Sequence, residues 1–172
     1  MDIRLATNSE IKLVKQFYDD IIDGQAFDEY SPRWTKDVYP SINDITSHIE
    51  NNEMYIGLIN NEIASAGVIT FNEDPIYVGG NWTITNENDV SVIHLFATSK
   101  KYRGTGISGE MLDNLINIIK NHNKKTIHLD VMLNNVPAEK IYLRHGFKYI
   151  GNKEVYYEDT GNMEVELFEC II

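Results

Sequence analysis

Two glycines two residues apart, Gly104 and Gly106, have the spacing that points most directly to chemistry. They follow an apolar run over residues 90–99 that predicts a strand, and they precede a segment over residues 111–121 with helical periodicity. Glycines in this place let the backbone turn tightly and approach a ligand, and the next helix offers free N–H groups at its positive end. Residues 103–108 therefore predict a pyrophosphate site, with a purely connective turn as the alternative.

Two common phosphate-binding motifs do not fit this loop. A P-loop would place a lysine and a hydroxyl residue after the second glycine, where this chain has Ile107. A dinucleotide-binding fingerprint needs a third glycine and an acidic residue at the end of the next strand, and Gly109 and Asp130 have suitable spacing. The loop begins only at residue 103, however, and no run of βαβ units surrounds it. The surroundings therefore argue against both motifs.

The elements that must position the loop follow from apolar periodicity, caps and turn residues. Strands are predicted over residues 3–7, 54–59, 62–71, 90–99, 126–132, 147–157 and 163–170. Helices are predicted from Asn8 or Ser9 to Gly24, over residues 42–51 and 111–121, and from Asn135 to Gly146. Residues 60–61 and 159–162 predict hairpin turns. We expect an α+β fold in which one mixed sheet carries helices on its faces.

Composition narrows the class of protein. A length of 172 residues predicts a single domain over residues 1–172. The net charge of −11 opposes binding to nucleic acid and is compatible with an amine acceptor. There is no apolar run of membrane-spanning length and no secretory signal, and Cys170 is the one cysteine, so we expect a cytoplasmic protein that is not in a membrane. The five histidines are scattered, and no metal is implied.

Two motifs resemble one protein family. Residues 101–106, Lys-Tyr-Arg-Gly-Thr-Gly, are similar to the Gln/Arg-x-x-Gly-x-Gly/Ala signature of the GNAT superfamily of acyl-CoA-dependent N-acyltransferases, with Lys101 at the first position. Residues 135–147 resemble the Asn-x-x-Ala-x-x-x-Tyr-x-x-x-Gly-Phe segment of the same proteins. The resemblance implies a GNAT-like, mostly antiparallel central sheet with helices on both faces. It also implies acetyl-CoA as the acyl donor and an amine as the acceptor.

The resemblance also implies where the donor binds. The pantetheine arm of CoA is an extended amide chain that can pair with a strand edge as a peptide does. The family contacts correspond to Phe96, Ala97 and Thr98, although Thr98 also fits an ordinary strand position. Asn135 corresponds to a further cofactor contact, and helix capping alone would also explain it. The pyrophosphate would lie on the amides of Tyr102, Arg103, Gly104, Thr105, Gly106, Ile107 and Ser108.

Acyl transfer from a thioester to an amine needs a neutral amine, a polarised carbonyl and a proton for the thiolate. Tyr142 matches the family tyrosine that supplies this proton, and a phenol with a pKa of about 10 is protonated at neutral pH. It also lies on the apolar face of its helix, so a core role is the alternative.

His94 interrupts the apolar run and is a candidate base for the amine's proton, directly or through water. Because it lies two residues before Phe96, we expect both side chains on one face of the strand. A packed histidine is the alternative. Glu73 and Asp74 are acidic rivals at the expected mouth of the cleft, and surface solvation is the favoured interpretation for each.

The first functional hypothesis is direct acetyl transfer to a small amine in a ternary complex, without an acyl-enzyme on Cys170. Transfer to a peptide N-terminus or lysine, and a non-catalytic acyl-CoA-binding module, are the alternatives. A homodimer is an assembly that the sequence allows. The acceptor side of the cleft is expected among aromatic residues, where cation–π attraction would favour a cationic group. These residues are Tyr30, Trp34, Tyr39 and Trp82, and core packing is the favoured interpretation for Trp34.

Overall fold

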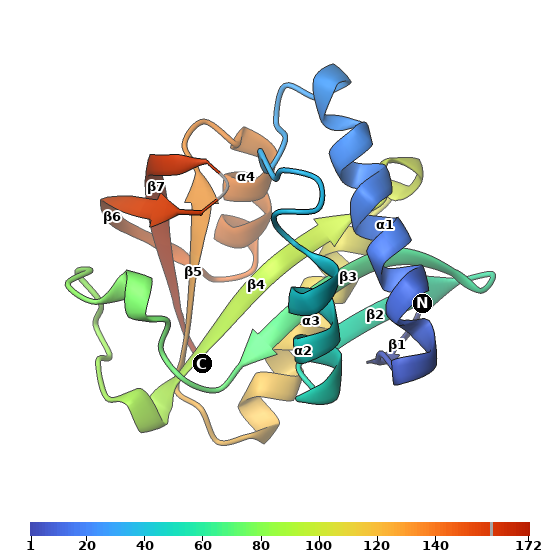
Figure 1. Cartoon of the computed structure of the whole chain (residues 1–172). Coiled ribbons are helices and arrows are strands. Elements are labelled where there is room, and N and C mark those ends of the chain that lie inside the picture. The colour runs from blue at the N-terminus through green and yellow to red at the C-terminus, as the bar shows by residue number, and fades with distance from the viewer. Residues whose placement is uncertain (159) are drawn as a thin grey trace.

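The computed structural model describes residues 1–158 and 160–172. The strands of these residues form one sheet in the order β1-β2-β3-β4-β5-β7-β6 (Figure 1). Neighbouring strands are antiparallel except β4 and β5, which are parallel. The strands are β1 (Asp2–Leu5), β2 (Met54–Ile59), β3 (Glu62–Thr70), β4 (Val90–Thr98), β5 (Thr126–Met132), β6 (Lys148–Tyr157) and β7 (Gly161–Ile171).

Helices cover both faces of the sheet (Figure 1). On one face, α1 (Ile11–Asp23) and α2 (Ile42–Glu50) bury their apolar sides against β2 and β3. On the other face, α3 (Ile107–Asn121) and α4 (Val136–Arg144) pack against β4, β5 and β7. Burial of these amphipathic faces supplies the main stabilising free energy of such a sandwich. The predicted α+β fold, with helices on both faces of a mostly antiparallel sheet, is confirmed.

Several element boundaries differ from the sequence prediction, and two of these differences concern the glycine loop and the last hairpin. The helix expected from residue 111 begins at Ile107, directly after Gly106, whose φ of 90° is left-handed. Apolar periodicity missed this first turn because its residues are polar, small or half-exposed. The last hairpin turn is shorter than residues 159–162, because β7 begins at Gly161. Asp159, part of that predicted turn, lies outside the described residues.

The sheet divides between β4 and β5. Only Val90–Val92 pair with Thr126–His128, and beyond these three pairs the two strands diverge (Figure 1). The edge of β4 from Ile93 onward therefore has no pairing with β5. A strand edge without a neighbour presents backbone donors and acceptors, so the divergence creates a place for an extended ligand.

Candidate active site

The glycine loop has the properties of a phosphate cradle. Gly104 and Gly106 have φ angles of 76° and 90°, and a Cβ built on either would meet no atom within 4 Å. The amides of Ile107, Ser108 and Gly109 make no hydrogen bond of ordinary geometry to a described residue. Unpaired N–H groups at a helix N-terminus, beside open space, suit an anion. The loop therefore fits the pyrophosphate that the sequence predicted there.

Side chains attach this loop to the end of β4. The Thr98 hydroxyl lies 2.8 Å from the Ser108 hydroxyl and 3.0 Å from that of Ser65. Arg103 donates to the Thr98 carbonyl at 3.3 Å and forms an ion pair with Asp28. Because the Arg103 charge is already compensated by Asp28, the loop would bind a phosphate mainly through its backbone amides.

A cleft of about 690 Å³ opens where β4 and β5 diverge. It brings together four of the predicted site residues, His94, Phe96, Asn135 and Tyr142. Ala97 and Thr98 follow Phe96 along β4 but do not line this cleft, and residues 102–108 lie beyond the C-terminal end of the strand. The predicted donor contacts therefore form a continuous path from the glycine loop along β4 to the cleft.

Tyr142 in α4 is 6% exposed and lines the cleft. Its ring packs between Phe96, at 6.1 Å, and Phe147, at 5.4 Å. Its hydroxyl makes no hydrogen bond to any described residue. Burial, with a smaller effect of the Asp130 charge, raises the pKa of Tyr142, which keeps the phenol protonated. Tyr142 is therefore part of the core, as the alternative from sequence held, and it also presents a protonated hydroxyl at the cleft.

A β-bulge separates His94 from Phe96. His94 pairs with Val68 and Ala97 with Ala66, so β4 has one more residue than β3 here. Leu95 is at a φ of 50° within this bulge. His94 consequently lies on the face of Val68, toward α2, whereas Phe96 packs with Tyr142 on the face of α3. The expectation that His94 and Phe96 share a face is wrong, because a bulge shifts the alternation of side chains by one residue.

The bulge also reorients a peptide group. Tyr18 in α1 donates a hydrogen bond of 2.8 Å to the Leu95 carbonyl. In a trans peptide the following N–H points the opposite way. The Phe96 amide is therefore turned away from α1, toward the face that carries Tyr142.

His94 is well placed to be neutral. Its side chain is 16% exposed, and its Nε2 lies 3.7 Å from an oxygen of Asp74. Burial lowers the pKa of His94, although the charges of Asp74 and Asp130 oppose this effect. A neutral imidazole at the cleft can accept a proton.

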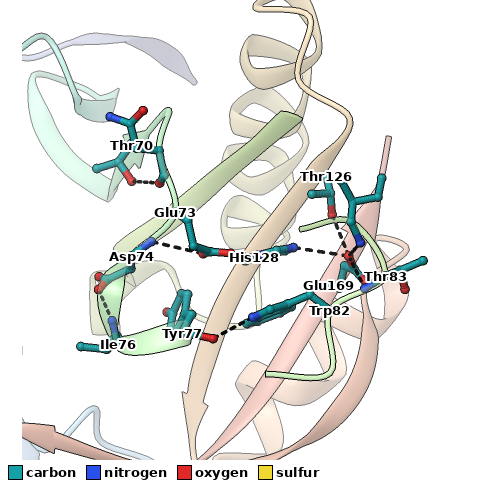
Figure 2. Close-up of polar contacts among 12 residues, drawn as sticks. Thr70, Glu73, Asp74, Ile76, Tyr77, Trp82, Thr83, Thr126, His128 and Glu169 are labelled. Atoms are coloured by element: carbon teal, nitrogen blue, oxygen red, sulfur yellow. Dashed lines mark hydrogen bonds and ion pairs between the residues drawn. The ribbon is translucent and has the colours of Figure 1, made fainter. Parts of the chain in front are cut away.

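The loop segment that carries Glu73 and Asp74 is attached to the sheet by the buried His128 (Figure 2). His128 in β5 lies between Glu73, at 2.7 Å from Nδ1, and Glu169, at 3.3 Å from Nε2. Trp82 stacks on its ring at a centroid distance of 3.8 Å. Glu73 is therefore bound to the sheet rather than solvated, contrary to the interpretation from sequence, and Asp74 next to it reaches the cleft.

Asp130 was missed as a site residue in the sequence. It accepts hydrogen bonds from the hydroxyls of Tyr77 and Tyr157, the second at 2.9 Å. It alternates with Leu129 and Val131 on β5, and it lines the cleft. An acidic residue in a central strand whose neighbours are buried was the available signal, because such a residue must have partners or a function.

Comparison with known proteins supplies the deciding observation. The model of the acetyltransferase (GNAT) family matches residues 20–147. This chain belongs to the GNAT family. The match covers the glycine loop, β4 and α4 as far as Phe147. No curated protein sequence matches the chain.

Solved GNAT structures have the same fold. A GNAT-family acetyltransferase from Streptococcus agalactiae shares 25% identity at a TM-score of 0.79, over 99% of this chain and 95% of that one. A GNAT-family acetyltransferase from Streptococcus pneumoniae has 17% identity and a TM-score of 0.74, over 99% of each chain. A ribosomal-protein-alanine N-acetyltransferase from Brucella melitensis has 13% identity and a TM-score of 0.74, over the full length of both chains. The fold of this GNAT enzyme is thus shared along its length.

The remaining predicted residues of this GNAT enzyme have local roles as well. Asn135 caps α4 by accepting from the Ala138 amide at 3.3 Å while it lines the cleft. Trp34 and Tyr39 line the cleft, whereas Trp82 packs on His128 and Tyr30 lies outside the cleft. Among the described residues, no group of three or more His, Cys, Asp or Glu could hold a metal ion. None of the helices in the described residues combines the length and the apolar character that a membrane span requires.

Proposed function

We propose that this chain, as a single domain over residues 1–172, transfers an acetyl group from acetyl-CoA to a primary amine of a small molecule. The observation that carries the proposal is the hydroxyl of the buried residue Tyr142, which burial keeps protonated and which has no hydrogen-bond partner among the described residues, in a cleft that also contains His94. A non-catalytic acyl-CoA-binding module would need neither group.

The residues present fit the donor. The amides at the start of α3 and the glycines before it would hold the pyrophosphate, and the unpaired edge of β4 would hold the pantetheine arm through Phe96, Ala97 and Thr98. Acetyl-CoA supplies the thioester whose acyl group is transferred. Asn135 lies at the same cleft and is a further contact for the donor.

The protein's own groups then account for the chemical needs of direct transfer. The neutral His94 accepts the proton of the acceptor ammonium, either directly or through water. The Phe96 amide, turned away from α1, is available to polarise a carbonyl oxygen. Tyr142 donates a proton to the leaving thiolate. No covalent intermediate on the protein is needed, and the buried Cys170, whose pKa is raised by burial, is a poor nucleophile.

A cleft of about 690 Å³ is of the size that binds small molecules, which favours a small amine over a protein acceptor. The test is consumption of acetyl-CoA with amines, polyamines, aminoglycosides, amino acids and short peptides, beside a thermal-shift titration with CoA. Turnover of a small amine supports the proposal. Turnover of peptides alone would assign the protein-acetyltransferase alternative, and CoA binding without turnover would favour the binding module. Cytoplasmic location stays a prediction from composition.

A further inference from the structure

The lining of the cleft carries acidic side chains without basic ones to balance them. Four carboxylates line the cleft, and no lysine or arginine is among its described lining residues. The carboxylates come from separate parts of the chain, so they do not form one patch by sequence proximity. They are Asp44, Asp74, Asp130 and Glu158.

We propose that the acceptor is a small dication, a primary alkylamine with a second ammonium group and without a carboxylate. This inference rests on the proposed function and names the substrate class of the same cleft. One amine reacts near Tyr142 and His94, and the second ammonium lies near Glu158 at the mouth.

The inner carboxylate, Asp130, is bound only by neutral groups among the described residues. Both of its oxygens accept from neutral phenols, those of Tyr77 and Tyr157, and no described lysine or arginine pairs with it. Two phenol donors fix the position of the carboxylate while they leave lone pairs for a further donor. A fixed, uncompensated carboxylate in a partly desolvated cleft attracts an ammonium group more strongly than a solvated one does.

The outer carboxylate, Glu158, is free. Its side chain is exposed and makes no hydrogen bond or ion pair to another described residue. Asp44 lies on a different wall of the same cleft, where it also completes the cap of α2 with Ser41. The mouth of the cleft therefore carries negative charge that no described lysine or arginine of its lining compensates.

Aromatic rings accompany the carboxylates. Trp34 and Tyr39 meet edge to face at a centroid distance of 6.5 Å, and Tyr156 adds an exposed ring on the other wall. Faces of such rings attract ammonium groups and the alkyl chain between them. An amino acid would instead bring its carboxylate among four carboxylates, with no lysine or arginine among the described lining residues to receive it, which opposes binding.

The hydroxyl of the buried residue Tyr142 provides an independent sign that a ligand enters here. It belongs to a side chain in a residue that is 6% exposed, has no partner among the described residues, and lines the same cleft. The hydroxyl of so buried a residue is normally hydrogen-bonded, so its partner is expected to be the bound ligand.

The experiment compares three amines of matched length: 1,4-diaminobutane, butylamine and 4-aminobutyrate. We expect kcat/KM at low salt to be at least ten-fold higher for the diamine than for butylamine, and lowest for 4-aminobutyrate. The preference should shrink as ionic strength rises. Calorimetric titration of each amine into the protein without acetyl-CoA gives the same ranking independently of turnover.

Two variants and one control test whether the carboxylates of the cleft cause the preference for the diamine. Glu158→Gln and Asp130→Asn should each lower the ratio of diamine to butylamine several-fold, whereas Glu50→Gln, the same charge change on the exposed end of α2, should leave it unchanged. Asp130→Asn also disturbs two tyrosines, so Glu158→Gln is the decisive variant.

The outcomes separate the two proposals. If the wild-type protein uses or binds butylamine or 4-aminobutyrate as strongly as the diamine, the proposal of a dicationic acceptor is wrong, while the proposal of acetyl transfer is unaffected. The proposal of a dicationic acceptor is also wrong if Glu158→Gln does not lower the preference for the diamine. Tight diamine binding without turnover of any amine supports the dication and contradicts the proposed function.

Discussion

The buried phenol of Tyr18 in α1 donates a hydrogen bond of 2.8 Å to the carbonyl oxygen of Leu95 in β4. Leu95 is at a φ of 50°, a conformation that a branched L residue adopts only at a cost in free energy of about 1–3 kcal/mol. Tyr18 is fully buried against Leu95, and burial raises the pKa of its hydroxyl, so the donor is always protonated. The hydrogen bond thus holds the peptide whose N–H faces the cleft.

Replacing Tyr18 by Phe should therefore affect both stability and turnover. The Leu95 carbonyl would lose its buried donor, which lowers the free energy of unfolding by about 1–2 kcal/mol. We expect kcat to fall by about ten-fold with the affinity for CoA unchanged, because the Phe96 amide is no longer held in place. Tyr55→Phe is the matched control, since Tyr55 is also buried but its hydroxyl makes no hydrogen bond to a described residue. Unchanged kcat in a folded Tyr18→Phe protein would contradict the positioning role.

Gly106→Val should abolish CoA binding. A Cβ there points into open space, so the folded protein has room for it, but valine would fill the space that the pyrophosphate needs and would resist a φ of 90°. Gly79→Val is the control for backbone strain, because Gly79 has a φ of 86° with open space around it and lies outside the loop. Calorimetric titration with CoA measures both. Equal affinity in the wild type and a folded Gly106→Val protein would remove the loop from the donor site.

Tyr142→Phe should lower kcat by ten-fold or more, because a general acid contributes about 10²- to 10⁴-fold. CoA affinity and thermal stability should change little, since the ring packing is retained and the hydroxyl bonds to no described residue. Stopped-time assays of acetyl-CoA consumption and a melting curve measure both quantities. Full activity in this variant would leave Tyr142 with its core role alone.

The pH profile should identify the base. Burial lowers the pKa of His94, so the rate should rise with pH below about 6.5 and be level at neutral pH, where the imidazole is already unprotonated. His94→Gln should lower the rate and remove this rise. Asp74→Asn should keep the rise and move it to lower pH, because the Asp74 charge favours the protonated imidazole. If the rise in rate persists in His94→Gln, a group other than His94 causes it.

Much of the fold could be predicted from sequence. The strand bounds Met54–Ile59 and Thr126–Met132 agree with the structure, because alternating apolar residues and flanking turn residues mark such strands locally. The Asn60-Asn61 turn is also local, and both residues have the positive φ that a tight hairpin requires. The family motifs located the glycine loop and Tyr142.

Other features depend on contacts distant in sequence. The bulge at Leu95 is held by Tyr18, which lies 77 positions earlier in the chain, so no local pattern in β4 indicates it. From sequence, Glu73 is interpreted as a solvated loop residue, because only the folded chain shows that His128 lies beside it. The role of Asp130 likewise appears only when Tyr77 and Tyr157 converge on it from two other segments.

The short seam between β4 and β5 has a consequence for how the protein opens. Three residue pairs join two half-sheets, of which β1 to β4 are neighbours in chain order and β5, β7 and β6 form the other. Each half makes its own ladder, and the residues of the three seam pairs are fully buried, so their amides should exchange slowly and opening should be confined to the diverging ends of the two strands. The cleft that admits the substrates thus lies where the two half-sheets are already apart.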